Sequence, residues 1–351
     1  MINIEELVRR AKEDGASDIH IICGLPPKYR RSGDLEDMES TIVTKEDCLA
    51  MAKQLSKTQE AFDELMTTGE LDAADSFADN RCRIHLFKQQ GVPSLALRIL
   101  SEHIPQLETL GVPPAVMDLP KLHKGIVLVT GETGSGKSTT LAAILDNINH
   151  NYKRHIVTLE DPVEYVYKPD LCAINQREVG KDTQSFAMGL RASLREDPNV
   201  ILIGEMRDRD TIETAITAAE TGHLVFGTLH TGSASDSIDR MVQVFPEAAQ
   251  QQIRLQLSMV LQAVLTQQLV QKKGGNGRVL AAEYMIVTDA IRNLIRTGGT
   301  PQIANAVATS ADIGGQTMDQ ALVMLVRRGL ITRENALHYC VNKDYVTRNM
   351  M

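Results

Sequence analysis

The chain is poor in aromatic residues and cysteine and has no long hydrophobic run. Its 351 residues include five cysteines, seven tyrosines, six phenylalanines and no tryptophan. The cysteines lie far apart without a C-x-x-C pair, which is typical of reduced cytoplasmic thiols and leaves no obvious zinc ligand set. No apolar run approaches the roughly 20 residues of a membrane span, and residues 1–15 lack the apolar centre of a secretory signal. We expect a soluble, cytoplasmic protein that reaches a membrane only through partners.

The sequence also lacks a basic excess. Lys and Arg number 37 against 45 Asp and Glu, so the formal net charge at pH 7 is −8. Proteins that follow a nucleic acid usually carry a basic face and often aromatic stacking platforms. We therefore expect no nucleic-acid partner, although the net charge does not exclude a local basic groove. The remaining composition is ordinary for a globular protein of two or three domains.

The first domain is expected over residues 1–98 and has a mixed α+β pattern. Threonines at positions 44 and 58 each precede a helical stretch and can accept a hydrogen bond from a first-turn N–H. No catalytic motif lies in this domain. Its expected elements are helices at 1–15, 44–55 and 58–66, strands at 17–21, 71–77, 81–89 and 94–100, and a Ser-Gly-Asp hairpin turn within 29–35.

A proline-rich segment separates the first domain from a second. Four prolines within residues 99–124 predict a linker. The second domain, 125–351, alternates apolar strands with helices, which predicts an α/β fold with a parallel sheet. Beyond about residue 246 the pattern predicts a helical region with a Gly-rich turn at 274–277. The alternating elements are strands at 126–130, 156–160, 200–204 and 224–229 and helices at 137–149, 183–196 and 208–221.

A glycine-rich motif follows the first strand of the second domain. It has the pattern G-x-x-x-x-G-K-S and opens a helix-forming stretch at Lys137. Its glycines let backbone N–H groups converge at a helix N-terminus, where phosphate groups bind. Lys137 can reach the β- and γ-phosphates, and Ser138 can ligate Mg²⁺. The sequence therefore predicts an ATP and Mg²⁺ site with the loop residues Gly131, Glu132, Thr133, Gly134, Ser135, Gly136, Lys137, Ser138 and Thr139.

Carboxylates follow two further strands of the same domain. Glu160 and Glu164 flank the end of the second strand, and Glu205 follows the third. Open α/β sheets bind ligands at the carboxyl ends of their strands. Glu160 and Glu164 are candidates for holding Mg²⁺ through water, although a solvated acidic turn is the alternative for this segment. Glu205 is the candidate for polarising the attacking water. Many phosphate-loop enzymes have Asp before this Glu, and here the position is Gly204.

Two histidines bracket the fourth strand. His230 follows its carboxyl end, where a side chain can sense the γ-phosphate, and His223 precedes its amino end. A single histidine is more often a core or surface residue than a catalytic one. The pairing on one strand of a nucleotide-binding sheet favours function. We expect His230 to act at the nucleotide and His223 to act at an interface or in coupling.

These motifs follow one another in a fixed order along the chain. In this order the chain resembles the secretion and pilus ATPase superfamily, and within it the retraction ATPases of twitching motility. The resemblance rests on the phosphate loop, Glu-Asp-Pro-Val-Glu, Gly-Glu-Met-Arg-Asp and Thr-Gly-His…Thr-Leu-His, and it covers nearly the whole chain. An Ala-Ile-Arg-Asn-Leu-Ile-Arg segment resembles the C-terminal signature of the retraction ATPases. By this resemblance the coupling residues are His223, Arg292, Asn293, Leu294, Ile295 and Arg296.

The resemblance implies a hexameric ring of subunits with a PAS-like N-terminal domain and a RecA-like ATPase domain. It implies ATP-driven pilus retraction, a platform protein of the inner membrane as partner, and a peripheral position on the cytoplasmic face of that membrane. Arg81, Arg83 and Arg98 match strand positions where the family carries arginines that reach the phosphates on domain closure. Strand-edge surface arginines are the alternative. Departures from the family pattern occur at Glu132 and Cys82 and at Gly232-Ser233.

Other functions share part of this pattern. Pilus-assembly and type II secretion ATPases carry the same nucleotide motifs, but they usually have a four-cysteine zinc insertion and longer N-terminal domains. A RecA-like nucleic-acid motor disagrees with the acidic charge and the 13 aromatic residues. A nucleotide switch without hydrolysis disagrees with the normal Glu205 site. We therefore expect a retraction motor, with the assembly or secretion ATPase as the alternative.

Overall fold

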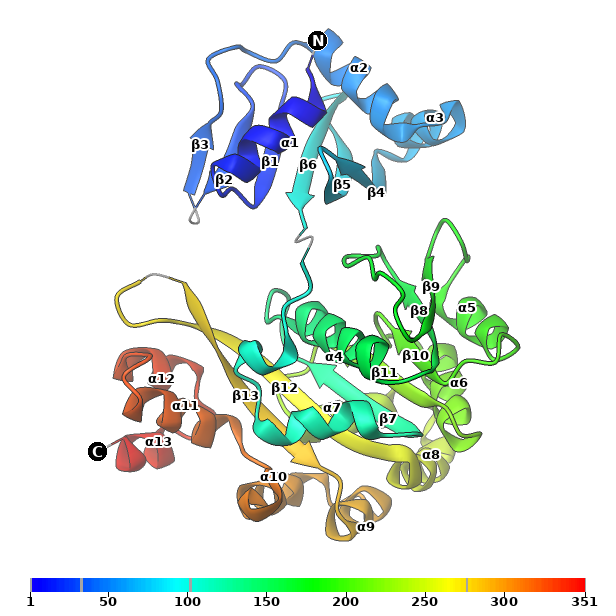
Figure 1. The fold of residues 1–351 in the computed structure, drawn as a ribbon, viewed down its shortest axis with the longest axis vertical. Helices are drawn as coiled ribbons and strands as arrows, with labels where there is room; N and C mark the ends of the chain where they lie inside the picture. The colour runs from blue at the N-terminus through cyan, green and yellow to red at the C-terminus, as the bar shows by residue number, and fades with distance from the viewer. Residues whose placement is uncertain (1, 32–33, 101–102, 276, 351) are drawn as a thin grey trace. The chain divides into compact units, whose positions relative to one another are not determined.

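The computed structural model describes residues 2–31, 34–100, 103–275 and 277–350. The chain divides into two compact units, 1–103 with 162–166 and 104–161 with 167–351 (Figure 1). The sequence predicted a linker over 99–124, whereas the boundary between the two units lies at residues 103 and 104. From residue 104 onward the segment belongs to the second unit, where the 3₁₀ helices η1 (Leu107–Leu110) and η2 (Pro114–Lys121) pack on helix α4 (Lys137–Asn151). Its prolines prevent α-helix, but its apolar side chains still become buried.

The first unit is a six-stranded antiparallel sheet with three helices. The strand order is β3-β2-β1-β6-β5-β4. Thr44 and Thr58 cap α2 and α3 as predicted. Ser32 and Gly33 of the predicted hairpin turn lie outside the described residues. The elements are α1 (Ile4–Glu13), β1 (Asp18–Ile21), β2 (Lys28–Arg31), β3 (Asp34–Asp37), α2 (Lys45–Ser56), α3 (Gln59–Thr68), β4 (Glu70–Phe77), β5 (Asn80–Gln89) and β6 (Val92–Ile99).

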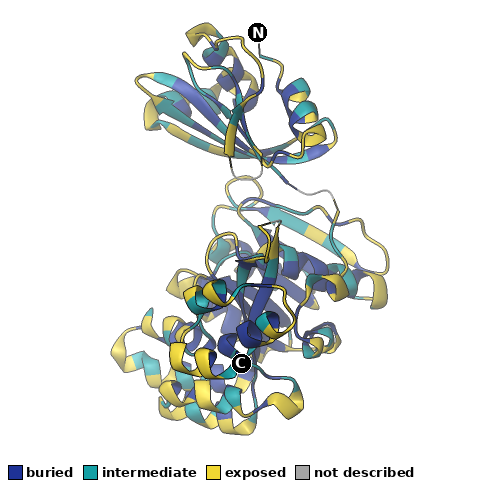
Figure 2. Ribbon diagram, turned by 90° about the vertical axis from the view of Figure 1, so that its left-hand side faces the viewer, coloured by how far each residue is buried: buried dark blue, intermediate teal, exposed yellow. Residues whose placement is uncertain are grey.

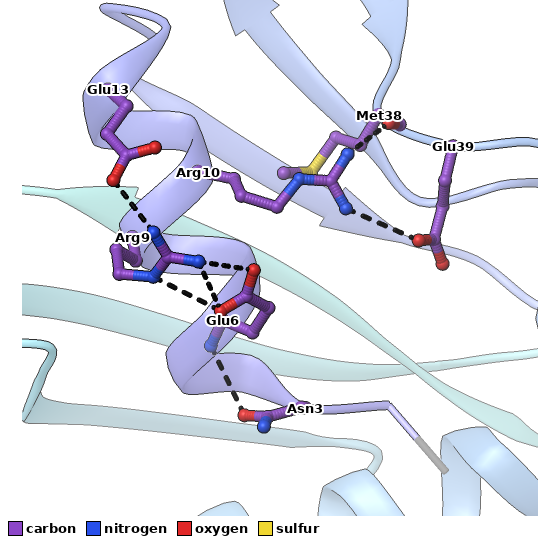
Figure 3. Close-up of polar contacts among 7 residues, drawn as sticks. All are labelled: Asn3, Glu6, Arg9, Arg10, Glu13, Met38 and Glu39. Carbon is purple, nitrogen blue, oxygen red and sulfur yellow. Dashed lines mark hydrogen bonds and ion pairs between the residues drawn. The ribbon is translucent and has the colours of Figure 1, made fainter.

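Helix α1 is held by polar contacts on its outer side (Figure 3). Asn3 accepts a hydrogen bond from the backbone N–H of Glu6 at 3.2 Å, which satisfies a first-turn donor. Arg9 forms an ion pair with Glu6 one turn away. Arg10 donates to the carbonyl of Met38 at 2.7 Å. These contacts orient the buried face of the helix, which consists of Ile4, Leu7, Val8 and Ala11.

The second unit is built on a seven-stranded sheet in the order β13-β12-β7-β11-β10-β8-β9. The strands from β12 to β9 run parallel, and helices alternate with them as predicted. The central strands β7, β10 and β11 are buried along their whole length (Figure 2). The elements are β7 (Gly125–Thr130), β8 (His155–Glu160), β9 (Ala173–Glu178), α5 (Phe186–Ser193), β10 (Val200–Ile203), α6 (Arg209–Glu220), β11 (Leu224–Leu229), α7 (Ala234–Gln243) and α8 (Glu247–Val260).

The region predicted to be helical from residue 246 contains a long β-hairpin, so that prediction was wrong over 261–286. Strands β12 (Leu261–Gln271) and β13 (Arg278–Ile286) pair antiparallel, and β12 adds in parallel to β7. Leu and Gln favour helix locally, but pairing with the buried edge of β7 outweighs this small preference. Asn276 of the predicted turn lies outside the described residues.

The remaining C-terminal residues are helical, as predicted. Buried side chains of this region form their own apolar cluster against β12 and β13, with Val270 and Ala281 contributed by the hairpin. Among the residues the structure describes, no helix is long and apolar enough to cross a bilayer. The helices are α9 (Asp289–Thr297), α10 (Ile303–Ala308), α11 (Met318–Arg327), α12 (Arg333–Tyr339) and α13 (Lys343–Asn349).

Candidate nucleotide-binding site

The glycine-rich loop connects the carboxyl end of β7 to α4. Its three glycines, Gly131, Gly134 and Gly136, have φ angles of +136°, +80° and +94°, which L-residues with a side chain rarely adopt. A Cβ on Gly131 would lie 2.4 Å from the carbonyl oxygen of Gln267 in β12. The close approach of β12 therefore requires glycine at the first loop position.

The loop has the features of an anion cradle. Lys137 is 9% exposed, and its Nζ donates to the carbonyls of Gly131 at 2.7 Å and Glu132 at 3.0 Å. The buried Oγ of Ser135 has no hydrogen-bond partner among the described residues. No side chain in the described part of the chain caps α4, so its first backbone N–H groups face the loop uncapped. These donors and the helix dipole fit a polyphosphate.

The other loop residues lie around this cradle. Glu132, Thr133 and Ser138 are exposed, and Thr139 is half-buried. Ser138 stands in the first turn of α4, where a hydroxyl can reach a metal on the phosphates. Because the side chain of Glu132 is exposed, water screens its charge.

Glu205 and His230 meet at the carboxyl edge of the sheet. Glu205 follows β10, and His230 follows β11, its parallel neighbour. The Nε2 of His230 lies 3.4 Å from Oε1 of Glu205, whose side chain is 20% exposed. Partial burial and the positive charges of Lys137 and Arg207 lower the pKa of His230, and Glu205 opposes this shift. The lowered pKa favours the neutral imidazole, in which one ring nitrogen donates a hydrogen bond and the other accepts one.

Arg207 is a site residue that the sequence argument did not select. Its guanidinium donates a hydrogen bond to Glu205 Oε1. This hydrogen bond raises the pKa of Arg207. The side chain is 74% exposed. The position two residues after Glu205 was a signal available in the sequence, because residues i and i+2 of an extended segment lie on the same side.

Gly204 holds the segment that carries Glu205. Its N–H donates to the carbonyl of Leu159 at 2.7 Å, and its carbonyl accepts from the hydroxyl of Thr228. A Cβ at this position would lie 3.1 Å from the Leu159 oxygen, tighter than ordinary packing. Close contact with β8 thus explains glycine where related enzymes often have aspartate.

The structure separates the two acidic candidates of the 160–164 segment. Glu160 ends β8 and accepts from Thr158 Oγ1 at 2.6 Å and Gln176 Nε2 at 3.3 Å, so its carboxylate is held at the sheet edge. Glu164 belongs to residues 162–166, which group with the first unit. The metal-holding roles of both residues stay predictions.

The three arginines selected from the first domain share one face of its sheet. Arg83 of β5 is the register partner of Arg98 of β6, and Arg81 is two residues from Arg83. Arg98 is paired with Asp18 at 2.8 Å, and Arg81 Nε donates to the carbonyl of Val163 at 3.4 Å. Their action on a nucleotide stays a prediction.

His223 lies at the opposite, amino end of β11 from His230. Its Nδ1 is 2.9 Å from the carbonyl oxygen of Ala218, which fixes the proton on Nδ1. It lines a cleft of about 420 Å³ together with His123 and Arg154. His223 therefore lies away from the edge of the sheet that carries the phosphate loop. Its role at an interface or in coupling stays a prediction.

The residues of the C-terminal signature differ in their surroundings. Arg292 Nη1 donates to three carbonyls at the end of α8, those of Ser258 at 2.7 Å, Leu261 at 3.1 Å and Met259 at 3.2 Å. Ile295 is buried, and Leu294 is half-buried. Asn293 and Arg296 are exposed on α9. The signature therefore combines a structural side and a solvent-facing side.

We expect Arg292→Ala and Arg296→Ala to differ in stability. Loss of Arg292 leaves carbonyls at the end of α8 without their donor, which should lower the free energy of unfolding by about 1–3 kcal/mol. Loss of the exposed Arg296 should change it by less than about 0.5 kcal/mol. Thermal unfolding of both variants measures this. Equal stability of the two proteins would contradict the capping role of Arg292.

The fold and the loop define a P-loop nucleotide-binding protein. The profile of the family described as Type II/IV secretion system protein matches residues 1–338, and the chain belongs to that family. It is 44% identical over 337 residues to the type IV pilus retraction ATPase PilT of Pseudomonas aeruginosa, covering 95% of this chain and 97% of that protein.

Two further comparisons agree with this family. A twitching motility protein of Neisseria gonorrhoeae is 47% identical over 264 residues, covering 75% of this chain and 71% of that protein. A crystal structure of the pilus retraction motor PilT with bound ADP superposes with a TM-score of 0.91 at 43% identity, covering 99% of this chain and 100% of that one. The family expected from the sequence motifs is confirmed.

Proposed function

We propose that this protein is an ATP-hydrolysing motor that powers the retraction of type IV pili. The observation that carries the proposal is the meeting of the phosphate loop, Glu205 and His230 at one edge of the parallel sheet. The 44% identity over 95% of the chain to a pilus retraction ATPase supports the particular task. The acidic chain offers no support for a nucleic-acid track.

Each site residue has one task in the proposed reaction. The loop N–H groups and Lys137 hold the phosphates and offset their charge. Glu205 orients and polarises the water that attacks the γ-phosphorus in line, and Arg207 fixes the Glu205 carboxylate. His230, neutral and beside Glu205, contacts the γ-phosphate side of the site. Positioning and charge stabilisation account for most of the expected acceleration.

Ser138 is the residue we propose for holding Mg²⁺, with Glu160 and Glu164 acting through water. Mg²⁺, when bound, neutralises charge that develops on the phosphate oxygens. Glu160 is suited because Thr158 and Gln176 already orient its carboxylate. Oxygen donors of this kind are those that Mg²⁺ prefers.

We further propose that the first unit is PAS-like, that the second is RecA-like, and that subunits assemble into a hexamer. Arg81, Arg83 and Arg98 would complete the nucleotide site on domain closure, which would make hydrolysis depend on shape. The working partner would be a platform protein of the inner membrane, reached from its cytoplasmic face. Asn293 and Arg296, both solvent-exposed on α9, are the members of the signature best placed to transmit work to it.

The cellular test is deletion of the gene, followed by counting of surface pili and scoring of twitching. We expect excess pili without motility, because pili would still assemble but not retract. A copy of the wild-type gene should restore motility. Loss of surface pili would contradict retraction and indicate the alternative, a pilus-assembly ATPase, and unchanged pili with failed secretion would indicate a type II secretion ATPase.

A further inference from the structure

One buried carboxylate lies outside the residues considered so far. Glu283 is in β13, and only 9% of its surface is exposed. Its Oε1 accepts a hydrogen bond at 2.8 Å from the backbone N–H of Ala234, the first residue of α7. The backbone N–H of Met318, the first residue of α11, is near enough to lower the pKa of this carboxyl. The carboxylate thus caps the N-terminus of α7 and faces the start of α11.

Burial of the Glu283 carboxylate costs free energy unless hydrogen bonds compensate for the lost water. Burial raises the pKa of Glu283, and the charges of Asp236 and Asp319 raise it further, against the two backbone donors. A buried charge is stable only when its hydrogen bonds are made, and removal of the carboxylate leaves the N–H of Ala234 at the start of α7 without its partner.

Helix α7 begins four residues after His230. In the segment between them, Thr231 Oγ1 lies 2.6 Å from Ser237 Oγ, and Ser233 accepts from the N–H of Asp236 at 3.1 Å. Both partners belong to the first turn of α7. The segment therefore moves with the start of the helix. The His230 side chain itself is 41% exposed, so its position beside Glu205 depends on this backbone.

Glu283 also belongs to a row of cross-strand partners that ends beside the phosphate loop. It is the register partner of Thr266 in β12, which in turn pairs with Thr130 at the end of β7. The hydroxyls of Thr130 and Thr266 are 2.9 Å apart and buried. Figure 1 shows β13 beside β12 in this sheet. Thr130 directly precedes Gly131, so one row of residues leads from the loop to the carboxylate.

We propose that Glu283 is a positioning residue for ATP hydrolysis, which acts by holding the His230 segment through the start of α7. This inference rests on the proposed ATPase activity. Glu283 touches neither nucleotide nor attacking water in this scheme. Its carboxylate sets where His230 stands relative to Glu205 through the hydrogen bond from the N–H of Ala234.

The test compares Glu283→Gln in two backgrounds of the full chain. Gln has nearly the same size but no negative charge, and its NH₂ group cannot accept a hydrogen bond, so the hold on the N–H of Ala234 at the start of α7 weakens. We expect kcat for ATP to fall about tenfold with KM changed less than about twofold, because binding groups stay in place. In the His230→Ala background the same change should lower kcat by no more than about twofold, since its route of action is already absent.

Asp319→Asn is the matched control. Asp319 is also a buried carboxylate and accepts from the N–H groups of Val341 at 2.8 Å and Asn342 at 2.9 Å. It therefore caps the start of the α13 region without touching α7. We expect this variant to lose stability but keep kcat within about twofold of the wild type. Glu283→Asp, which keeps the charge on a shorter side chain, runs in parallel in case the Gln variant does not fold, with the same background dependence expected.

The outcomes separate the inference from the function on which it rests. Absence of ATP turnover in the wild-type protein would contradict the proposed function itself. Normal turnover with an unchanged rate in the folded Glu283 variants would overturn the positioning role alone. An equal loss of kcat in the wild-type and His230→Ala backgrounds, or an equal loss in Asp319→Asn, would also overturn it, because the effect would then not pass through His230.

Discussion

Glu205→Gln should bind ATP as tightly as the wild type while its turnover falls by about 10²–10⁴-fold, the range that a positioned general base supplies. Gln has nearly the same shape and can still accept from Arg207, so the loop and the ion-pair geometry around position 205 should persist. What it loses is the negative charge that polarises water. Steady-state ATPase assays and the affinity for a fluorescent ATP analogue measure the two quantities separately.

The control for this variant is Glu213→Gln. Glu213 is an exposed carboxylate on α6, in an ion pair with Arg209 on the protein surface. Its loss changes the net charge of the chain by the same amount, and we expect no effect on turnover. If Glu205→Gln and Glu213→Gln turn over ATP at the same rate, Glu205 takes no part in the chemical step.

Lys137→Ala should weaken ATP binding by about 10–100-fold and abolish measurable hydrolysis, because a hydrogen bond from a charged donor is worth about 1.5–3 kcal/mol. The Nζ now bridges the carbonyls of Gly131 and Glu132, within the loop that is expected to hold the phosphates. Its loss removes both a positive charge for the phosphates and a clamp that holds the loop together. Isothermal titration with ATP gives the affinity, and phosphate release gives the rate.

Lys121→Ala serves as its control. Lys121 is an exposed lysine of η2, and it lies before β7 in the sequence, where its side chain pairs with Asp118 on the protein surface. We expect wild-type affinity and turnover from this variant. Retained ATP affinity in Lys137→Ala would mean that the backbone N–H groups alone bind the phosphates, and the assignment of Lys137 would then be limited to the reaction.

The two strongest predictions depend on a site whose parts come from separate strand ends. Lys137 follows β7, Glu205 follows β10 and His230 follows β11. Each part is brought to the edge by parallel pairing rather than by neighbouring positions in the chain. Glycine at positions 131 and 204 is what allows the strands to come this close, because a Cβ at either would press on a carbonyl of the adjacent strand.

The sequence by itself determined the features that depend on local chemistry. The spacing of Gly131, Gly136 and Lys137 specifies the loop because positive φ angles and converging N–H groups depend on a few consecutive residues. Threonine caps at positions 44 and 58 specify helix starts for the same reason. The apolar runs that become β7, β10, β11 and the middle of β8 could be predicted because a buried parallel strand is mostly apolar. Glu205 was selected as a candidate because it directly follows the third of these apolar runs, at the edge where open α/β sheets bind ligands.

Only the tertiary structure decided features that depend on distant partners. The segment that forms β12 has ordinary helix-forming residues, and pairing with the buried strand β7 made it a strand. Arg292 became a cap because the end of α8 lies against α9. Glu283 became the cap of α7 because this helix begins beside β13. In each case the deciding interaction joins residues far apart in the chain, and neither periodicity nor a short motif encodes which distant backbone groups will need a partner.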